Sequence, residues 1–229
     1  MKQYLKYLIL LLTLTVLVGC SFHTQEGSKP SNTVTSLTQE EIDAANEAFA
    51  TTVEDADTGE IHTSEVSCFF TCYYDKPEEI SLSSFLKYFP NSSILESSDE
   101  AEFAKLRELP GFPFNNDGNT STVESLPVPI HKYPKEAVSE VLLKYANITA
   151  DDIINTDDVL YLEEYDAYYN FTSDFGPGIF VCVGGEKAGD IIRLWSAPKD
   201  NDGSRDVLTI READGGYFIQ AYQELKELQ

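Results

Sequence analysis

The first half of the chain carries apolar residues at helical spacing. Thr38 and Glu41 fit an N-terminal capping box, and the apolar positions after them, Ile42, Ala45, Ala48 and Phe49, predict a helix to about residue 50. Three further helices are predicted in the same way: over 81–89, from a capping box at 97–100 to Leu109, and from Pro134 to a C-cap at Asn147.

The second half has the pattern of strands. From Val159 onward, strand-like runs cover 159–162, 179–183, 191–195, 207–211 and 217–222, and two earlier extended pieces cover 65–74 and 128–132. Residues 184–189 are predicted to be a loop, and Asp214-Gly215-Gly216 a hairpin turn. Such short connections make antiparallel neighbours. We therefore expect an α+β fold, with helices packed on one face of an antiparallel β-meander, in a single globular domain over residues 38–229.

The N-terminus has a different residue pattern. Lys2 and Lys6 precede an apolar run over 8–18, which is too short to span a bilayer and has the length of a signal-peptide core. The run ends at Leu17-Val18-Gly19-Cys20. Residues 1–19 are therefore predicted to be a lipoprotein signal peptide. Residues 20–37 are rich in Ser, Thr, Gly, Pro and Asn, so a flexible tether is predicted there.

The motif Leu17-Val18-Gly19-Cys20 resembles a bacterial lipobox, and with the polar segment and acidic body it is similar to uncharacterised secreted lipoproteins of Gram-positive bacteria. The resemblance implies that Cys20 receives diacylglycerol, becomes the mature N-terminus and anchors the chain on the extracytoplasmic face of the cell membrane. The alternative is a non-lipidated signal peptide with a chance cysteine. Because the motif covers only the first twenty residues, it brings no activity or ligand with it.

Charge narrows the possible partners. Removal of residues 1–19 takes away Lys2 and Lys6 and no acid, which leaves 14 basic and 39 acidic side chains and a formal charge of −25. Such a charge argues against nucleic acid and against an anionic surface as electrostatic partner. It is compatible with calcium, with a cationic peptide, or with an acidic face that only interacts with water.

Three cysteines remain besides Cys20, so at most one intramolecular disulfide can form. Cys68 and Cys72 fall in one predicted strand, about 13 Å apart, so they cannot bond to each other there. Either could pair with Cys182, although buried free thiols are the favoured state. A CxxxC pair with one distant cysteine is a poor zinc pattern, and we expect no metal site and no cofactor.

Candidate chemistry concentrates in EEYDAYYNFTSDFGPG, residues 163–178. No nucleophile elbow, zincin motif, P-loop or dinucleotide fingerprint occurs in the chain. Six aromatic residues fall within 161–175, next to carboxylates, and tyrosine suits sugars and peptides. The candidate ligand-binding residues are Tyr165, Asp166, Tyr168 and Tyr169. The competing interpretation is that the rings pack into the core and that Gly176-Pro177-Gly178 turns the chain.

These observations predict a lipid-anchored extracytoplasmic binding or interaction module with a glycan, peptide or protein ligand. The alternative is a cell-surface hydrolase that resembles a glycoside hydrolase, in which carboxylates supply an acid and a base. Its candidate residues are Glu163, Glu164, Asp166 and Asp174.

Overall fold

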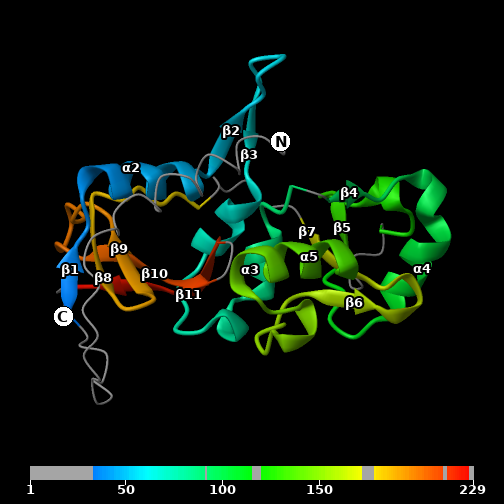
Figure 1. Cartoon of the computed structure of the whole chain (residues 1–229). Coiled ribbons are helices and arrows are strands. Elements are labelled where there is room, and N and C mark those ends of the chain that lie inside the picture. Colours follow the sequence, from blue (N-terminus) through cyan, green and yellow to red (C-terminus); the bar gives the residue numbers. More distant parts are fainter. Residues whose placement is uncertain (1–32, 91, 115–119, 172–177, 214–215, 227–229) are drawn as a thin grey trace, which may run out of the picture. The chain divides into compact units, whose positions relative to one another are not determined.

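The computed structural model describes residues 33–90, 92–114, 120–171, 178–213 and 216–226. They fold into helices and antiparallel sheets, so the predicted α+β class is confirmed (Figure 1). The described residues belong to one unit that begins at Thr33. The proposed signal peptide and lipidation site, Cys20 included, lie outside the described residues.

The predicted meander forms most of a five-stranded sheet. In spatial order its strands are β1 (Val34–Ser36), β8 (Gly184–Ala188), β9 (Ile191–Trp195), β10 (Arg205–Ala213) and β11 (Gly216–Leu225). Each neighbouring pair is antiparallel. Strand β9 has the predicted bounds, whereas β10 and β11 are longer than predicted.

Two strands of this sheet correct the sequence prediction. Val34–Ser36, placed in the tether, forms β1 and pairs with β8, so ordered structure begins before residue 38. Residues 184–188, placed in a loop, form β8. The two glycines of β8 serve close packing: a Cβ on Gly184 would lie 2.5 Å from Trp195 Nε1, and one on Gly185 would lie 2.5 Å from Leu37 Cδ1.

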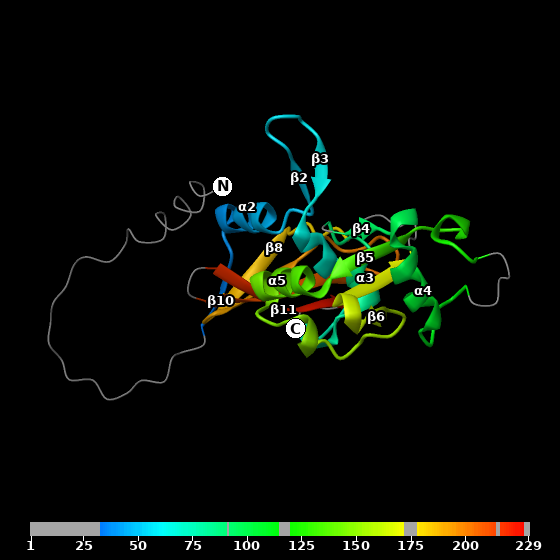
Figure 2. The same ribbon diagram turned by 90° about the vertical axis from the view of Figure 1, so that its right-hand side faces the viewer.

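A second sheet was not predicted as a unit. In spatial order its strands are β4 (Ser93–Ile94), β5 (Ile130–Pro134), β7 (Ala167–Phe171) and β6 (Leu160–Leu162), again all antiparallel. A separate hairpin of β2 (Thr52–Glu54) and β3 (Ile61–Thr63) projects from the body in both views (Figures 1 and 2). The fold therefore contains more than a single meander.

The predicted helices are present. They are α2 (Gln39–Ala48), α3 (Leu82–Leu86), α4 (Glu100–Glu108) and α5 (Lys135–Ala146). The capping box of Thr38 and Glu41 is confirmed, and Asn147 ends α5 in the left-handed conformation. Before α4 the capping box is Glu96 with Asp99, one residue earlier than predicted.

Short 3-10 helices fill several connections: η1 (Glu65–Phe70), η2 (Pro77–Glu79), η3 (Ser97–Asp99), η4 (Val123–Ser125), η5 (Ala150–Asp152) and η6 (Glu163–Tyr165). The strand predicted over 65–74 was wrong, because η1 occupies its first part. Its residues from Val66 to Phe70 are all buried, and a short, fully buried run has no periodicity that separates strand from helix.

The strand predicted over 179–183 was also wrong, although its side chains alternate. Phe180 and Cys182 are buried while Ile179, Val181 and Val183 are exposed. The segment has no partner strand at Cys182. Instead, the Asn46 side chain of α2 accepts from the Cys182 N–H (2.8 Å) and donates to its C=O (2.9 Å).

Two clusters of buried apolar residues hold the fold together. The larger joins α2, η1, α3 and α5 to the five-stranded sheet, and the smaller lies between α4 and the four-stranded sheet. Helix α5 contacts both β11 and β5, so it links the two sheets (Figure 1).

Candidate functional site

The structure does not bring the four predicted ligand-binding residues onto one surface. Tyr168 and Tyr169 are neighbours on β7, so their rings point to opposite faces of the sheet. Tyr168 is buried in the larger cluster and Tyr169 in the smaller one. Tyr165 packs against the smaller cluster as well. Asp166 is exposed, has a φ of 44°, and accepts a hydrogen bond from the Tyr161 hydroxyl at 2.7 Å.

Two of the four carboxylates of the hydrolase hypothesis have separate partners. Glu164 forms an ion pair with Lys105 (3.0 Å), and Asp166 is engaged by Tyr161. Glu163 is exposed, and Asp174 lies outside the described residues. Neither of the two grooves described below is lined by a described residue of this segment.

A buried polar cluster, which the sequence pattern signals only indirectly, connects α4 to the four-stranded sheet. Glu102 of α4 is 6% exposed and accepts hydrogen bonds from the Tyr169 hydroxyl (2.5 Å) and from Lys132 Nζ of β5 (3.0 Å). The ammonium of Lys132 also lies 5.0 Å from the ring centre of Tyr165. Burial, and then the hydrogen bond to Glu102, raise the pKa of Tyr169 well above its ordinary value, so this hydroxyl stays a donor.

This cluster fastens α4 to the four-stranded sheet. Its signal in the sequence was an acid within an apolar stripe, because Glu102 shares a helical face with Leu106 and Leu109. Both tyrosines that contact the cluster were candidate ligand residues. Their positions in the structure give them packing roles.

A groove of about 500 Å³ lies at the end of β11, and we call it the tyrosine groove. Its lining residues come from two segments: Tyr73, Tyr74, Asp75 and Glu79 from one, and Gln223, Glu224 and Leu225 from the other. Backbone hydrogen bonds between Tyr74 and Tyr222, at 2.8 and 3.0 Å, hold the two segments side by side. The Gln223 amide donates to the Asp75 carboxylate at 2.6 Å.

Lys199 forms a charged network at one side of the tyrosine groove. Its ammonium contacts Glu224, Asp206 (2.9 Å) and the Tyr73 hydroxyl (2.7 Å). The Tyr73 hydroxyl in turn donates to Asp206 at 2.7 Å. The hydrogen bond to Glu224, followed by the one to Tyr73, raises the pKa of Lys199 above its usual value. The lysine therefore stays charged and offsets the charge of Glu224.

The other two carboxylates that line the groove, those of Asp75 and Glu79, lack such an ion-pair partner in the part of the chain that the structure describes. Among the described residues, neither Asp75 nor Glu79 has a lysine, arginine or histidine within ion-pair distance. The Tyr73 side chain beside them is 48% exposed. The groove thus combines an accessible aromatic ring, an amide and two carboxylates that have no ion-pair partner among the described residues. The predicted strand over 65–74 includes Tyr73 and Tyr74 and ends before Asp75, and the aromatic–acid pattern of 73–75, which resembles that of residues 161–169, was overlooked.

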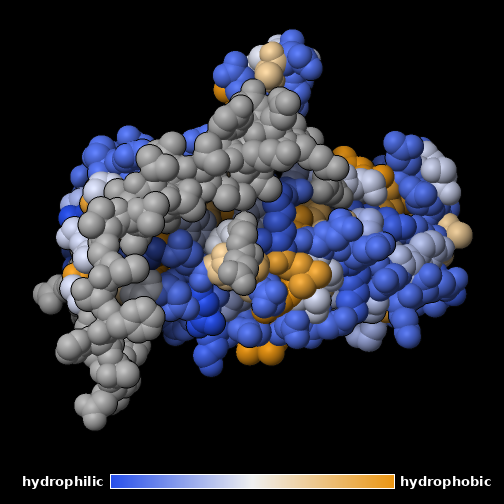
Figure 3. Space-filling model, in the orientation of Figure 1, coloured by the Kyte–Doolittle hydropathy of each residue, from blue (hydrophilic) through white to orange (hydrophobic). Residues whose placement is uncertain are grey.

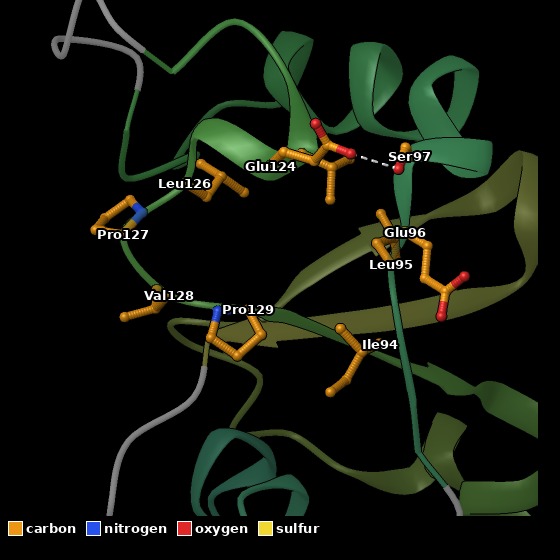
Figure 4. Close-up of a pocket in the computed structure, with 10 residues that line it drawn as sticks. Ile94, Leu95, Glu96, Ser97, Glu124, Leu126, Pro127, Val128 and Pro129 are labelled. Carbon is orange, nitrogen blue, oxygen red and sulfur yellow. Dashed lines mark hydrogen bonds between the residues drawn. The ribbon is translucent and has the colours of Figure 1, made fainter.

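A second groove, of about 380 Å³, lies beside β4, and we call it the proline groove. One wall runs from Ile94 to Ser97 and the other from Leu126 to Pro129, and Val123 and Glu124 of η4 complete the lining. Figure 4 shows an open hollow between the two walls, with the Ser97 hydroxyl donating to Glu124 across its upper end at 2.7 Å. In Figure 3, hydrophobic surface is visible beside β4.

The cysteines of the folded part are free thiols, so neither possible pairing with Cys182 is present. Cys68 is fully buried, and burial raises the pKa of its thiol to about 12. Burial also raises the pKa values of Cys72 and Cys182. All three are therefore held as unreactive thiols at neutral pH, which suits packing rather than redox chemistry.

His131 has a comparable structural setting. Burial lowers its pKa, its Nδ1 lies 3.3 Å from the Ser92 hydroxyl, and its ring stacks with Tyr133. Across the described ranges, no group of three or more His, Cys, Asp or Glu residues is arranged to hold a metal ion. None of the helices in this part of the chain has the length and apolar character needed to cross a bilayer.

Comparison with known proteins found no matching family model, no similar curated protein and no similar solved structure. The two grooves and the N-terminal motif are therefore the features that bear on function.

Proposed function

We propose that this chain is a lipid-anchored protein on the extracytoplasmic face of the cell membrane, and that its folded part is a binding module. The lipobox at residues 17–20 supports the anchor. One observation carries the binding role: an exposed tyrosine and two carboxylates without a basic partner share the tyrosine groove. A ligand with a positively charged group, such as a cationic peptide, complements this groove.

The hydrolase alternative receives less support. Its carboxylates at Glu164 and Asp166 have neighbours that hold them separately. Neither of the two grooves described above is lined by residues 163–171. A catalytic role in hydrolysis stays a prediction for Glu163 and for Asp174.

The anchor is tested by replacing Cys20 with serine. Because serine offers no thiol for diacylglycerol transfer, we expect the Cys20→Ser chain to lose labelling by an alkyne fatty acid in a bacterial host and to retain the mass of residues 1–19. Cys72→Ser, which changes a cysteine of the folded part, should label as the parent does. Equal labelling and equal mass for Cys20→Ser and the parent would contradict the anchor.

The binding role is tested by thermal shift of the full chain with lysine amide, arginine amide, cationic wall peptides, neutral glycans and Ca²⁺. We expect a cationic compound to raise the unfolding midpoint, since a ligand that binds only the folded state stabilises it. The double change Asp75→Asn and Glu79→Gln should abolish that rise. Glu136→Gln removes an exposed charge on α5 and should leave it intact. If a cationic compound still raises the unfolding midpoint of the double variant, the binding site is not the tyrosine groove.

A further inference from the structure

We propose that the proline groove docks an extended segment of a partner protein in which an apolar side chain lies next to lysine or arginine. This surface is separate from the tyrosine groove, with which it shares no lining residue. The proposal therefore adds an interaction surface to the function proposed above.

The first step is the shape of the groove. The Leu95 N–H donates to the Ile130 C=O at 3.0 Å, and beyond this contact the chains of 96–97 and 126–129 separate. The hydrogen bond from Ser97 to Glu124 spans the far end, and the Val123 N–H donates to Glu100 Oε1 at 3.1 Å. These contacts hold the hollow open before any ligand arrives. A preformed hollow avoids the entropic cost of ordering its walls on binding.

The second step is the apolar surface of the walls. Ile94 is 52% exposed, and Figure 4 shows its side chain and that of Leu126 directed toward the hollow from opposite sides. Pro127, Val128 and Pro129 extend the same wall as Leu126. Exposure of such apolar surface to water is unfavourable, and the free energy falls when another apolar side chain covers it. The volume suits one or two side chains rather than a whole domain.

The third step concerns hydrogen bonds. Pro127 and Pro129 have no N–H, so their wall offers mainly carbonyl acceptors. An occupant that brings N–H donors fits this wall. The ammonium of lysine, the guanidinium of arginine and the amides of an extended backbone all meet that requirement.

The fourth step is charge. Glu96 and Glu124 line the groove, no lysine, arginine or histidine does, and neither carboxylate has an ion-pair partner among the described residues. In Figure 4, Glu124 lies at the upper end of the hollow, whereas the Glu96 carboxylate is turned away from it. Asp99 and Glu100 follow close by in η3 and α4. This acidic surrounding complements a basic segment and repels an acidic one.

The test measures binding of fluorescent octapeptides to the full mature chain held in nanodiscs of zwitterionic lipid, with empty nanodiscs as the blank. One peptide alternates leucine with lysine, a second leucine with glutamate, and a third serine with lysine. In the Asp75→Asn, Glu79→Gln background, which removes the carboxylates of the tyrosine groove, we expect only the leucine–lysine peptide to bind. It should bind at least tenfold more weakly at 500 mM than at 50 mM salt.

Variants locate the site. Val128→Asp should weaken the leucine–lysine peptide at least tenfold, and Glu124→Gln, which keeps an acceptor for Ser97, at least threefold. Both groove variants are made in the Asp75→Asn, Glu79→Gln background, which removes the carboxylates of the tyrosine groove, so a failure of either proposal is distinguished from a failure of the other. The midpoint of thermal unfolding, unchanged for Glu124→Gln, shows that the fold is intact. Absence of binding up to millimolar peptide, equal binding of the leucine–glutamate or serine–lysine peptide, or unchanged affinity in both groove variants would overturn the proposal.

Discussion

Replacement of Glu102 by alanine is expected to lower the free energy of unfolding by about 3 kcal/mol. The reason is that Glu102 is buried and accepts hydrogen bonds from Lys132 and from Tyr169. Loss of one partner of a buried ion pair leaves the other charge poorly compensated, which costs about 3–5 kcal/mol. The lower end applies because the Lys132 side chain is partly accessible to water. Urea denaturation followed by circular dichroism measures the change.

A matched control is available on the same helix. Glu108 is exposed, so Glu108→Ala should change the free energy of unfolding by no more than about 0.5 kcal/mol. Lys132→Met in the Glu102→Ala background should recover part of the loss, since it removes the unpaired charge and keeps an apolar stem. If Glu102→Ala and Glu108→Ala are equally stable, the buried cluster does not fasten α4 as described.

The second large effect is expected at Gly178. A Cβ added there would lie 2.4 Å from the carbonyl carbon and 2.4 Å from the carbonyl oxygen of Phe70. Both atoms belong to the backbone of η1, which cannot move aside as a flexible side chain could. We expect Gly178→Ala to reduce stability by about 2 kcal/mol or more, within the range seen for overpacked sites. Differential scanning calorimetry should show the lowered midpoint.

Gly216 provides the control for this substitution. A Cβ on Gly216 meets no atom within 4 Å, and Gly216 lies in strand β11, so Gly216→Ala should leave the midpoint nearly unchanged. Equal midpoints for Gly178→Ala and the parent would show that the chain at residue 178 can separate from η1. That result would show that the fold does not require glycine at position 178.

Local signals predicted the helices well. Thr38 with Glu41, and Asn147 after α5, act through hydrogen bonds within a few residues of each other, so the sequence alone contains the necessary information. Strand β9 was predicted with the correct bounds because its apolar run is long enough and is bordered by turn residues. These elements are set by their own residues.

Elements that depend on distant partners were missed or misassigned. Strand β8 contains Gly184 and Gly185, and two successive glycines predict a loop. In the structure they lie in a strand because Trp195 and Leu37 leave no room for a side chain at these positions. Strand β1 is recognisable only through β8, about 150 residues later in the chain. In the four-stranded sheet, the runs predicted over 128–132 and 159–162 correspond to β5 and β6, whereas β4, with two residues, and β7 were not predicted as strands.

The candidate site shows the same division. The sequence identified tyrosines and acids as the residue types to watch, but it could not show that Tyr168 and Tyr169 are buried on opposite faces of β7. It also could not place Asp75 beside Gln223, because β11 supplies one wall of the tyrosine groove and residues 73–79 the other. A groove made from two distant segments has no signature in either segment alone.

The pairing of β1 with β8 has a mechanical consequence. If Cys20 is anchored in the membrane, any pull on the folded part is transmitted through residues 20–33 and arrives first at β1. This strand has only three residues, all exposed, and lies at the edge of the five-stranded sheet. It should therefore detach from β8 before the other four strands separate. Its release would lengthen the reach of the module by about 10 Å, at roughly 3.3–3.6 Å per extended residue. The edge strand would then act as a short extensible link between the membrane and the grooves.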